Sequence, residues 1–273
     1  MRRENEKRNG SMEVNIIYNE DCLYTMNERL IGGGIDVVLT SPPYNTGRDL
    51  KTQRARDNHE GRYDEYSESK TNEEYDEFTV DLFNGFDKIL SPNGVVLYNI
   101  SYGTENPTQM WTCISEVCKR TNFTIADVIV WKKQSALPNN VSANKLTRIC
   151  EFVFILCRKS EYNTFTMNKE ISSKREDNGQ IIYKNVFNFI EAPNNDGVNA
   201  LNKATFSTIF ARKLLNMYAK PNSLVYDCFM GTGTTAIACI KEKHNFVGSE
   251  ISTRQWQYAN NRIKKEQAQL TLF

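Results

Sequence analysis

Two consecutive prolines end an apolar stretch early in the chain, and they limit the possible fold more than any other feature. The apolar run Asp36-Val37-Val38-Leu39, typical of a buried strand, continues into Thr40-Ser41-Pro42-Pro43-Tyr44-Asn45. Because proline lacks the N–H that a strand ladder needs, the strand must end at Ser41. The fixed φ of both prolines makes the following turn stiff, with a hydroxyl before it and an aromatic ring after it.

This turn carries the groups needed to hold a flat ring that bears an amino group. Such a ring can stack on Tyr44 while its exocyclic NH2 donates hydrogen bonds to the Ser41 hydroxyl and the Pro42 carbonyl. Two acceptors on that nitrogen keep its lone pair out of the ring, so that it can attack. A plain strand-ending turn explains the same residues, and the turn alone does not decide the function.

A second motif, far downstream, predicts a site for a nucleotide-like ligand. Residues 223–235 read Ser-Leu-Val-Tyr-Asp-Cys-Phe-Met-Gly-Thr-Gly-Thr-Thr, which predicts a strand ending at Asp227 and a glycine-rich turn that opens a helix. Gly231 and Gly233 allow a ligand to approach the backbone closely. The next predicted strand ends at Glu250, where nucleotide-binding folds hold a ribose diol. An ordinary glycine-rich connection is the simpler alternative.

With both motifs the chain resembles the amino-group DNA methyltransferases that use S-adenosylmethionine, as found in restriction-modification systems. The signatures of that family are a Ser/Asp/Asn-Pro-Pro-Tyr catalytic turn and an Asp-x-Phe-x-Gly-x-Gly-Thr cofactor loop, matched here at Ser41 and at Asp227. The catalytic turn comes first, which is similar to the order in the permuted beta group. The resemblance covers about residues 14 to 268.

Strands and helices are predicted to alternate, which is typical of a doubly wound α/β sheet. The resemblance likewise implies a mostly parallel, Rossmann-like sheet with a small inserted target-recognition segment. We expect a helix with Tyr75 and Ile89 on its apolar face, a turn at Ser91-Pro-Asn-Gly94, and one short strand pair around Ile181 to Phe189. The expected organisation is a disordered tail (1–13), a catalytic half (14–159), a target-recognition insertion (160–200) and a cofactor-binding half (201–273).

The resemblance also implies which residues bind S-adenosylmethionine. Asp21 follows the first predicted strand, where the family has an aspartate that contacts the adenine, although an aspartate there can equally cap the next helix. Phe206 lies in a segment similar to one that lines the family's cofactor pocket, but the usual proline is missing. The implied cofactor residues are Asp21, Thr40, Phe206, Asp227, Phe229, Gly231, Gly233, Thr234 and Glu250, beside the catalytic residues Ser41, Pro42, Pro43 and Tyr44.

A DNA-binding surface has to come from local charge, because the net charge is only +1. Residues 119–159 carry eight Lys/Arg and two acidic residues, and a long polar stretch (45–74) follows the proline turn, where it can fold over DNA. Basic stretches of this kind are often only solvated surface. The candidate DNA-binding residues are Asn45, Arg48, Lys132, Lys133, Lys145 and Arg148.

The cysteines and histidines exclude several other classes of protein. Seven cysteines without Cys-x-x-Cys spacing argue against a disulfide framework. The sequence has only two histidines, which argues against a zinc site, so we expect no metal. No cysteine follows a proline, unlike the nucleophile of cytosine-C5 methyltransferases. The polar N-terminus and the lack of a long apolar run favour a cytoplasmic protein without a membrane anchor.

The sequence therefore predicts a site-specific enzyme that methylates N4 of cytosine in double-stranded DNA after base flipping. The choice of cytosine depends on Ser41, because family members with serine there mostly modify cytosine; N6 of adenine is the alternative. A methyltransferase of protein glutamine or RNA, a nicotinamide-dependent dehydrogenase and a non-catalytic DNA-binding subunit are more remote alternatives. A cognate restriction endonuclease and a second copy of the chain are possible partners.

Overall fold

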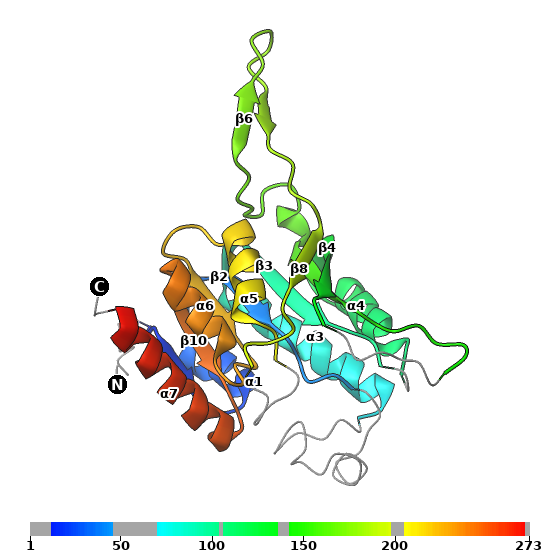
Figure 1. Ribbon diagram of the computed structural model, residues 1–273, viewed down its shortest axis with the longest axis vertical. Coiled ribbons are helices and arrows are strands. Elements are labelled where there is room, and N and C mark those ends of the chain that lie inside the picture. The colour runs from blue at the N-terminus through cyan, green and yellow to red at the C-terminus, as the bar shows by residue number, and fades with distance from the viewer. Residues whose placement is uncertain (1–11, 46–69, 104–105, 136–141, 198–204, 271–273) are drawn as a thin grey trace, which may run out of the picture.

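The computed structural model describes residues 12–45, 70–103, 106–135, 142–197 and 205–270. These residues form one eight-stranded sheet with helices on both faces, and a separate two-stranded hairpin that projects away from them (Figure 1). Most of the expected tail (1–13) and most of the polar stretch after the proline turn lie outside the described residues. Within those ranges, no helix is long and apolar enough to cross a membrane.

The sheet has the strand order β1-β10-β9-β2-β3-β5-β4-β8. All neighbouring pairs are parallel except the two made by β5, which runs antiparallel to β3 and to β4. The predicted mostly parallel sheet is therefore confirmed. The strands are β1 (Ile16–Tyr18), β2 (Ile35–Thr40), β3 (Leu90–Ile100), β4 (Phe123–Lys133), β5 (Cys150–Arg158), β8 (Phe189–Ala192), β9 (Leu224–Asp227) and β10 (Asn245–Ser249).

Helices cover both faces, each over its own apolar core. One core joins the sheet to α5 (Thr208–Tyr218), α6 (Thr234–Glu242) and α7 (Thr253–Leu270). The other joins it to α3 (Asn72–Ile89), α4 (Gln109–Arg120) and the short α1 (Cys22–Tyr24), which continues as the π-helical turn η1 (Thr25–Arg29). This arrangement is the doubly wound architecture that the alternating pattern predicts.

The start of α3 lies inside the stretch for which the sequence predicts no regular structure. Thr71 accepts a hydrogen bond from the Glu74 amide, and the Glu74 side chain accepts one from the Thr71 amide. This capping box starts the helix before the first apolar residue of its buried face. The predicted turn at Ser91–Gly94 is an irregularity within β3: Leu90 pairs with Ile35, and Val95 already pairs with Val37.

The expected strand pair around Ile181 to Phe189 is wrong in its pairing. Ile181–Tyr183 (β7) pairs with the upstream strand Ile171–Lys174 (β6) in the projecting hairpin, whereas β8 joins the main sheet beside β4. β8 is an edge strand of the large sheet, and its apolar residues Ile190 and Ala192 are buried there. Burial of these side chains stabilises this position more than pairing with the short strand β7 would.

The hairpin begins at the amino ends of the parallel strands. The reversed direction of β5 brings the chain to this edge, and residues 159–161 (η2, Lys159–Glu161) follow. The Thr166 amide donates to the carbonyl of Asn93, at the start of β3, and Asn168 donates to the carbonyl of Ala219, at the end of α5. Within the expected target-recognition insertion, β8 and the residues after it return toward the other edge of the sheet.

Candidate active site

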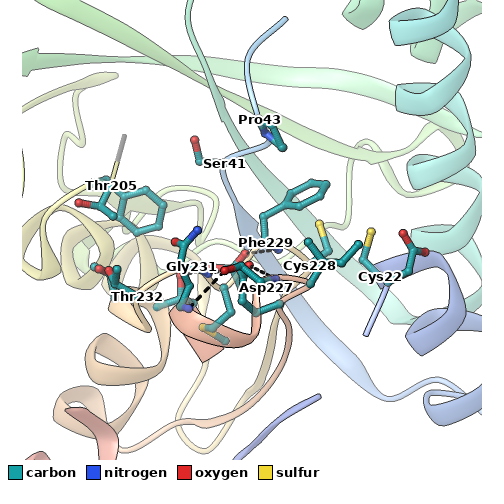
Figure 2. A pocket seen from close by; sticks show the side chains of 18 of the residues that line it. Cys22, Ser41, Pro43, Thr205, Asp227, Cys228, Phe229, Gly231 and Thr232 are labelled. Carbon is teal, nitrogen blue, oxygen red and sulfur yellow. Dashed lines mark hydrogen bonds between the residues drawn. The ribbon is translucent and has the colours of Figure 1, made fainter. Parts of the chain in front are cut away.

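The two sequence motifs lie side by side, because β2 and β9 are neighbours in the sheet. Val37 pairs with Val225 and Val38 with Tyr226, so the proline turn and the glycine loop leave the sheet at the same carboxyl edge. Ligands bind at this edge in open α/β sheets. Here a cleft of about 960 Å³, open to solvent, separates Ser41 and Pro43 on one side from Asp227 and the glycine loop on the other (Figure 2).

Asp227, at the end of β9, joins the two motifs. Its Oδ1 accepts hydrogen bonds from Thr40 Oγ1 (2.7 Å) and from the Phe229 amide (3.0 Å), and its Oδ2 accepts one from Thr235 Oγ1 (2.5 Å). Burial disfavours the charged form and raises the pKa of Asp227 to about 6, although these three donors act in the opposite direction. The Asp227 carboxyl therefore fixes the start of the glycine loop, because it contacts Phe229 and Thr235 on one side and Thr40 on the other.

The glycine loop has backbone angles that favour glycine. Gly231 has a φ of 54° and Gly233 a φ of 85°. A Cβ on Gly233 would lie 3.0 Å from the Cβ of Ala259, so the loop also needs a small residue there to pack against α7. The Gly231 amide donates to Glu250 Oε2 (2.7 Å), and the other oxygen of Glu250 accepts from the Ser252 amide (2.9 Å).

The cleft suits S-adenosylmethionine, a ligand with polar ends and a flat base. Thr232 lines the cleft, and its buried Oγ1 has no hydrogen-bond partner among the described residues, as expected where a ligand supplies one. Asp21 caps α1 through its Oδ1, at 2.8 Å from the Leu23 amide, and also lines the cleft.

Most of the residues predicted to bind the cofactor line this one cleft. They are Asp21, Phe206, Asp227, Phe229, Gly231, Thr234 and Glu250. Thr40 and Gly233 are not among the lining residues: Thr40 is fully buried and holds Asp227, and Gly233 packs against α7. Thr40 supports the loop through Asp227 and Gly233 through its packing against α7, and a cofactor contact of Thr40 stays a prediction.

The proline turn is fixed from two directions. Tyr75 in α3 donates its hydroxyl hydrogen to the Pro43 carbonyl (3.1 Å). On the other side, the hydroxyl of Tyr44 lies 3.3 Å from Ser41 Oγ and donates to Glu151 Oε2 (3.1 Å). Ser41 and Pro43 line the cleft, whereas Pro42 is buried and Tyr44 is half-buried. The contact of the Pro42 carbonyl with an amine stays a prediction.

Four of the five described residues predicted to bind DNA already have partners within the protein. Lys132 pairs with Glu191 (3.0 Å) and Lys133 with Glu151, so carboxylates already hold both ammonium groups. Asn45 is buried and donates to the Lys70 carbonyl, whereas Arg148 donates to the Tyr102 carbonyl and lies over the Tyr102 ring. Lys145 is exposed, and Arg48 lies outside the described residues. Lys145 and Arg148 keep the exposure that phosphate binding requires.

Several site residues were not predicted from the sequence. Thr235 directly follows the glycine-rich turn, and Asn99 lies near the end of a predicted strand. Both positions are at the carboxyl edge of the sheet, which is a signal that could have identified them. Glu151 directly precedes an apolar strand, and an acidic residue at that position was a weaker signal. The remaining unpredicted lining residues come from the loops around the cleft and from helices α1, α3 and α7: Glu20, Cys22, Phe78, Thr205, Cys228, Met230, Thr232, Ile251, Ser252 and Gln255.

Comparisons with known proteins agree with this geometry. The type II methyltransferase M.Cfr9I of Citrobacter freundii is 22% identical over 292 residues, covering 95% of this chain and 91% of that protein. The structure of the PvuII DNA methyltransferase (cytosine-N4-specific) matches with a TM-score of 0.64 and 17% identity, over 89% of this chain and 84% of that one. The M1.HpyAVI–SAM complex matches with a TM-score of 0.58 and 19% identity, over 90% and 97%.

The family model described as DNA methylase, for N6 and N4 methylases, matches residues 35–261. This range includes the proline turn, the glycine loop and the strands that place them side by side. The cofactor of the family is S-adenosylmethionine, and its substrate is an amino group of a DNA base. The chain belongs to the N6/N4 DNA methylase family and is an S-adenosylmethionine-dependent DNA methyltransferase.

Proposed function

We propose that this enzyme methylates the exocyclic N4 of cytosine in double-stranded DNA, at a specific sequence, after the base has left the helix. The observation that carries the proposal is the position of Ser41 on the cleft wall opposite Asp227 and Gly231. A base inside duplex DNA cannot reach such a cleft, and extruding it costs a few kcal/mol. Stacking on the half-buried Tyr44 ring would return about 1–3 kcal/mol.

In this proposal, the residues of the chain hold and orient the amine. The Ser41 hydroxyl and the Pro42 carbonyl accept its two hydrogens, which keeps the nitrogen lone pair available. Asp21, Glu250 and the glycine loop hold S-adenosylmethionine, which supplies the methyl group as an electrophile. In this scheme, the rate of methyl transfer depends on the positioning of the target amine against S-adenosylmethionine and on the placement of polar groups around them.

Serine at position 41 favours cytosine. Its side chain is shorter than that of aspartate or asparagine, so the target amine has to lie closer to the backbone of the turn. Adenine N6 presents the same kind of amine and is the second candidate, because Tyr44 can stack on either base. The structural likeness to the PvuII enzyme shows the fold and does not decide between the bases.

The base is identified by digesting methylated DNA to nucleosides and analysing them by mass spectrometry. N4-methylcytidine without methyladenosine is expected after incubation of unmodified genomic DNA with enzyme and S-adenosylmethionine. N6-methyladenosine alone would overturn the choice of base and leave the enzyme class intact. Omitting S-adenosylmethionine is the control for modification already present in the DNA.

We further propose that the enzyme belongs to a restriction-modification system in the cytoplasm, with a cognate endonuclease as partner. Support comes from relatives named type II methyltransferases. Single-molecule sequencing of DNA from an expressing host would give the modified sequence, and protection of that sequence from an endonuclease tests the pairing. A homodimer, also expected, is tested by light scattering with and without DNA.

A further inference from the structure

Glu151 in β5 and Asn99 in β3 both contact the hydroxyl of Tyr44, and Lys133 in β4 pairs with Glu151. Glu151 starts β5, and because β5 is antiparallel, this start lies beside the ends of β3 and β4. Glu151 Oε2 accepts hydrogen bonds from the Tyr44 hydroxyl (3.1 Å) and from Asn99 Nδ2 (3.0 Å). Glu151 Oε1 forms an ion pair with Lys133 Nζ. The Glu151 side chain is only 12% exposed, so this set of donors replaces water around a carboxylate.

The carboxylate determines the direction of the next hydrogen bonds. An ionised carboxylate only accepts, and a tyrosine hydroxyl has a single hydrogen. That hydrogen is donated to Glu151, so the Tyr44 oxygen acts as the acceptor in its 3.3 Å contact with Ser41. The Ser41 hydrogen therefore points to Tyr44 and away from the cleft.

Asn99 also donates hydrogen bonds to the oxygens around the Tyr44 hydroxyl. Its Nδ2 donates to Glu151 Oε2 (3.0 Å) and to the Tyr44 oxygen (3.1 Å), and it lies 3.4 Å from Ser41 Oγ. An amide oxygen in this place would face a carboxylate oxygen, so the repulsion between them fixes the amide nitrogen toward the network. With its two hydrogens used by Glu151 and Tyr44, Asn99 adds a second donor to the Tyr44 oxygen beside Ser41.

The direction of the Ser41 hydrogen matters for the chemistry. A hydroxyl that donated to the target amine would occupy the nitrogen lone pair that must attack the methyl group. A hydroxyl whose hydrogen is already used instead presents oxygen lone pairs, which accept a hydrogen from the amine. An isolated serine can adopt either direction, because its hydroxyl rotates freely.

We propose that Glu151 is a positioning residue for methyl transfer: through Tyr44, it orients the Ser41 hydroxyl as an acceptor for the target amine. Glu151 accepts a hydrogen bond from Tyr44, which in turn contacts Ser41, so we assign Glu151 an indirect role through Tyr44. Lys133 balances the charge of Glu151, which gives it a role different from phosphate binding. The inference rests on the proposed acceptor role of Ser41 and holds for cytosine N4 and adenine N6 alike.

A double-mutant cycle tests the route through Tyr44. The variants are Glu151→Gln, Tyr44→Phe and their combination, assayed by tritiated methyl transfer to unmodified genomic DNA. Glu151→Gln can donate to Tyr44 and reverse the chain of hydrogen bonds, so kcat is expected to fall about 10- to 100-fold, with an unchanged Kd for S-adenosylmethionine. In the Tyr44→Phe background, Glu151→Gln is expected to have no further effect. Independent, multiplying effects would overturn the proposal.

Two further variants separate this role from a loss of stability. Glu191→Gln removes a carboxylate that is also paired with a lysine on β4, and it is expected to keep full kcat. Glu151→Asp keeps the charge beside Lys133 but withdraws it from Tyr44, so kcat is expected to fall while the melting temperature stays near that of the wild type. Full activity of Glu151→Asp would overturn the proposal.

A spectroscopic measurement tests the contact between Glu151 and Tyr44 independently of methyl transfer. With 3-fluorotyrosine incorporated at position 44, the fluorine resonance reports the hydroxyl and ring environment. We expect it to shift in Glu151→Gln and to stay unchanged in Glu191→Gln. The same resonance in all three proteins would overturn the proposal. Failure of the wild type to methylate any DNA base would instead contradict the proposed function.

Discussion

The hydroxyl of Thr40 donates a 2.7 Å hydrogen bond to the buried carboxylate of Asp227, across 187 residues of sequence. Thr40 is the last residue of β2 and Asp227 the last of β9, so the contact joins the proline turn directly to the glycine loop. Neither side chain can move without changing the environment of the other. We therefore expect cofactor binding and the geometry of the turn to be coupled through this hydrogen bond.

Thr40→Val should weaken this connection without changing side-chain shape. The variant loses a hydrogen bond to a charged group, which is expected to lower the free energy of unfolding by about 1.5–3 kcal/mol, and calorimetry should show a lower affinity for S-adenosylmethionine. Thr79→Val is the matched control: Thr79 is equally buried, but it donates to the Tyr75 carbonyl inside α3. Equal cofactor affinity in both variants would contradict the coupling.

Stability should depend on pH through Asp227. Its pKa in the folded protein, about 6, is above the ordinary 3.8, so folding favours the protonated carboxyl. This stabilising contribution is fully present below pH 3.8 and is lost as the pH rises through 6. Relative to Asp227→Asn, the wild type should therefore lose about 2 kcal/mol of unfolding free energy between pH 4 and pH 7. Urea titrations of both proteins at each pH measure this difference, and a constant difference would refute it.

Gly231→Val should abolish binding of S-adenosylmethionine while the protein stays folded. Gly231 has a φ of 54°, lines the cleft, and a β-branched side chain there is strained and stands where a ligand approaches the backbone. Gly179→Val places the same strain, at a φ of 69°, in the projecting hairpin and controls for it. Calorimetry should show wild-type affinity in the control only. Measurable affinity in Gly231→Val would place the ligand elsewhere.

Lys145 and Lys133 should respond differently to substitution. If exposed Lys145 binds a phosphate, Lys145→Ala should reduce the slope of log K against log salt by about one for all DNA sequences. Lys133→Ala should leave that slope unchanged, because Glu151 already holds its ammonium group. Lys220→Ala, an exposed lysine at the opposite edge of the sheet, is the control. A reduced slope for Lys133→Ala would restore it as a phosphate contact.

The projecting hairpin should be dispensable for sequence recognition. Its ends are joined by the hydrogen bond from the Lys184 amide to the Glu170 carbonyl, so residues 171–183 can be replaced by a short glycine turn. Because it leaves the sheet at the edge opposite the cleft, we expect unchanged cofactor affinity and an unchanged modified sequence, read by single-molecule sequencing. A changed sequence would support the target-recognition role that the sequence suggests for 160–200.

Local sequence patterns predicted much of this fold and its cofactor cleft. The double proline predicts the end of β2 correctly to within one residue, since missing N–H groups act wherever the strand lies. The motif from Asp227 to Thr234 predicts a strand, a turn and a helix, because glycine and carboxylate act through local backbone geometry. Helix α3 follows from apolar spacing alone.

The unpredicted parts depend on pairings between distant residues. Nothing local in the sequence indicates that Glu151 faces Lys133, because this contact depends on the antiparallel register of β4 and β5. The same register turns a predicted DNA-binding lysine into the partner of a buried carboxylate. The contact of Thr40 with Asp227 was not predicted either, because alternation along β2 and the packing of β9 turn its hydroxyl toward Asp227.

The strand order also determines how the two walls of the cleft can move. β9 and β10, from the C-terminal part of the chain, lie between β1 and β2, which both come from the N-terminal part. The glycine loop is thus enclosed on both sides by strands from the other half, and no hinge between the halves can open the cleft. The cleft is already open to solvent at the carboxyl edge, so ligand entry and product exit do not require the strands of its floor to separate.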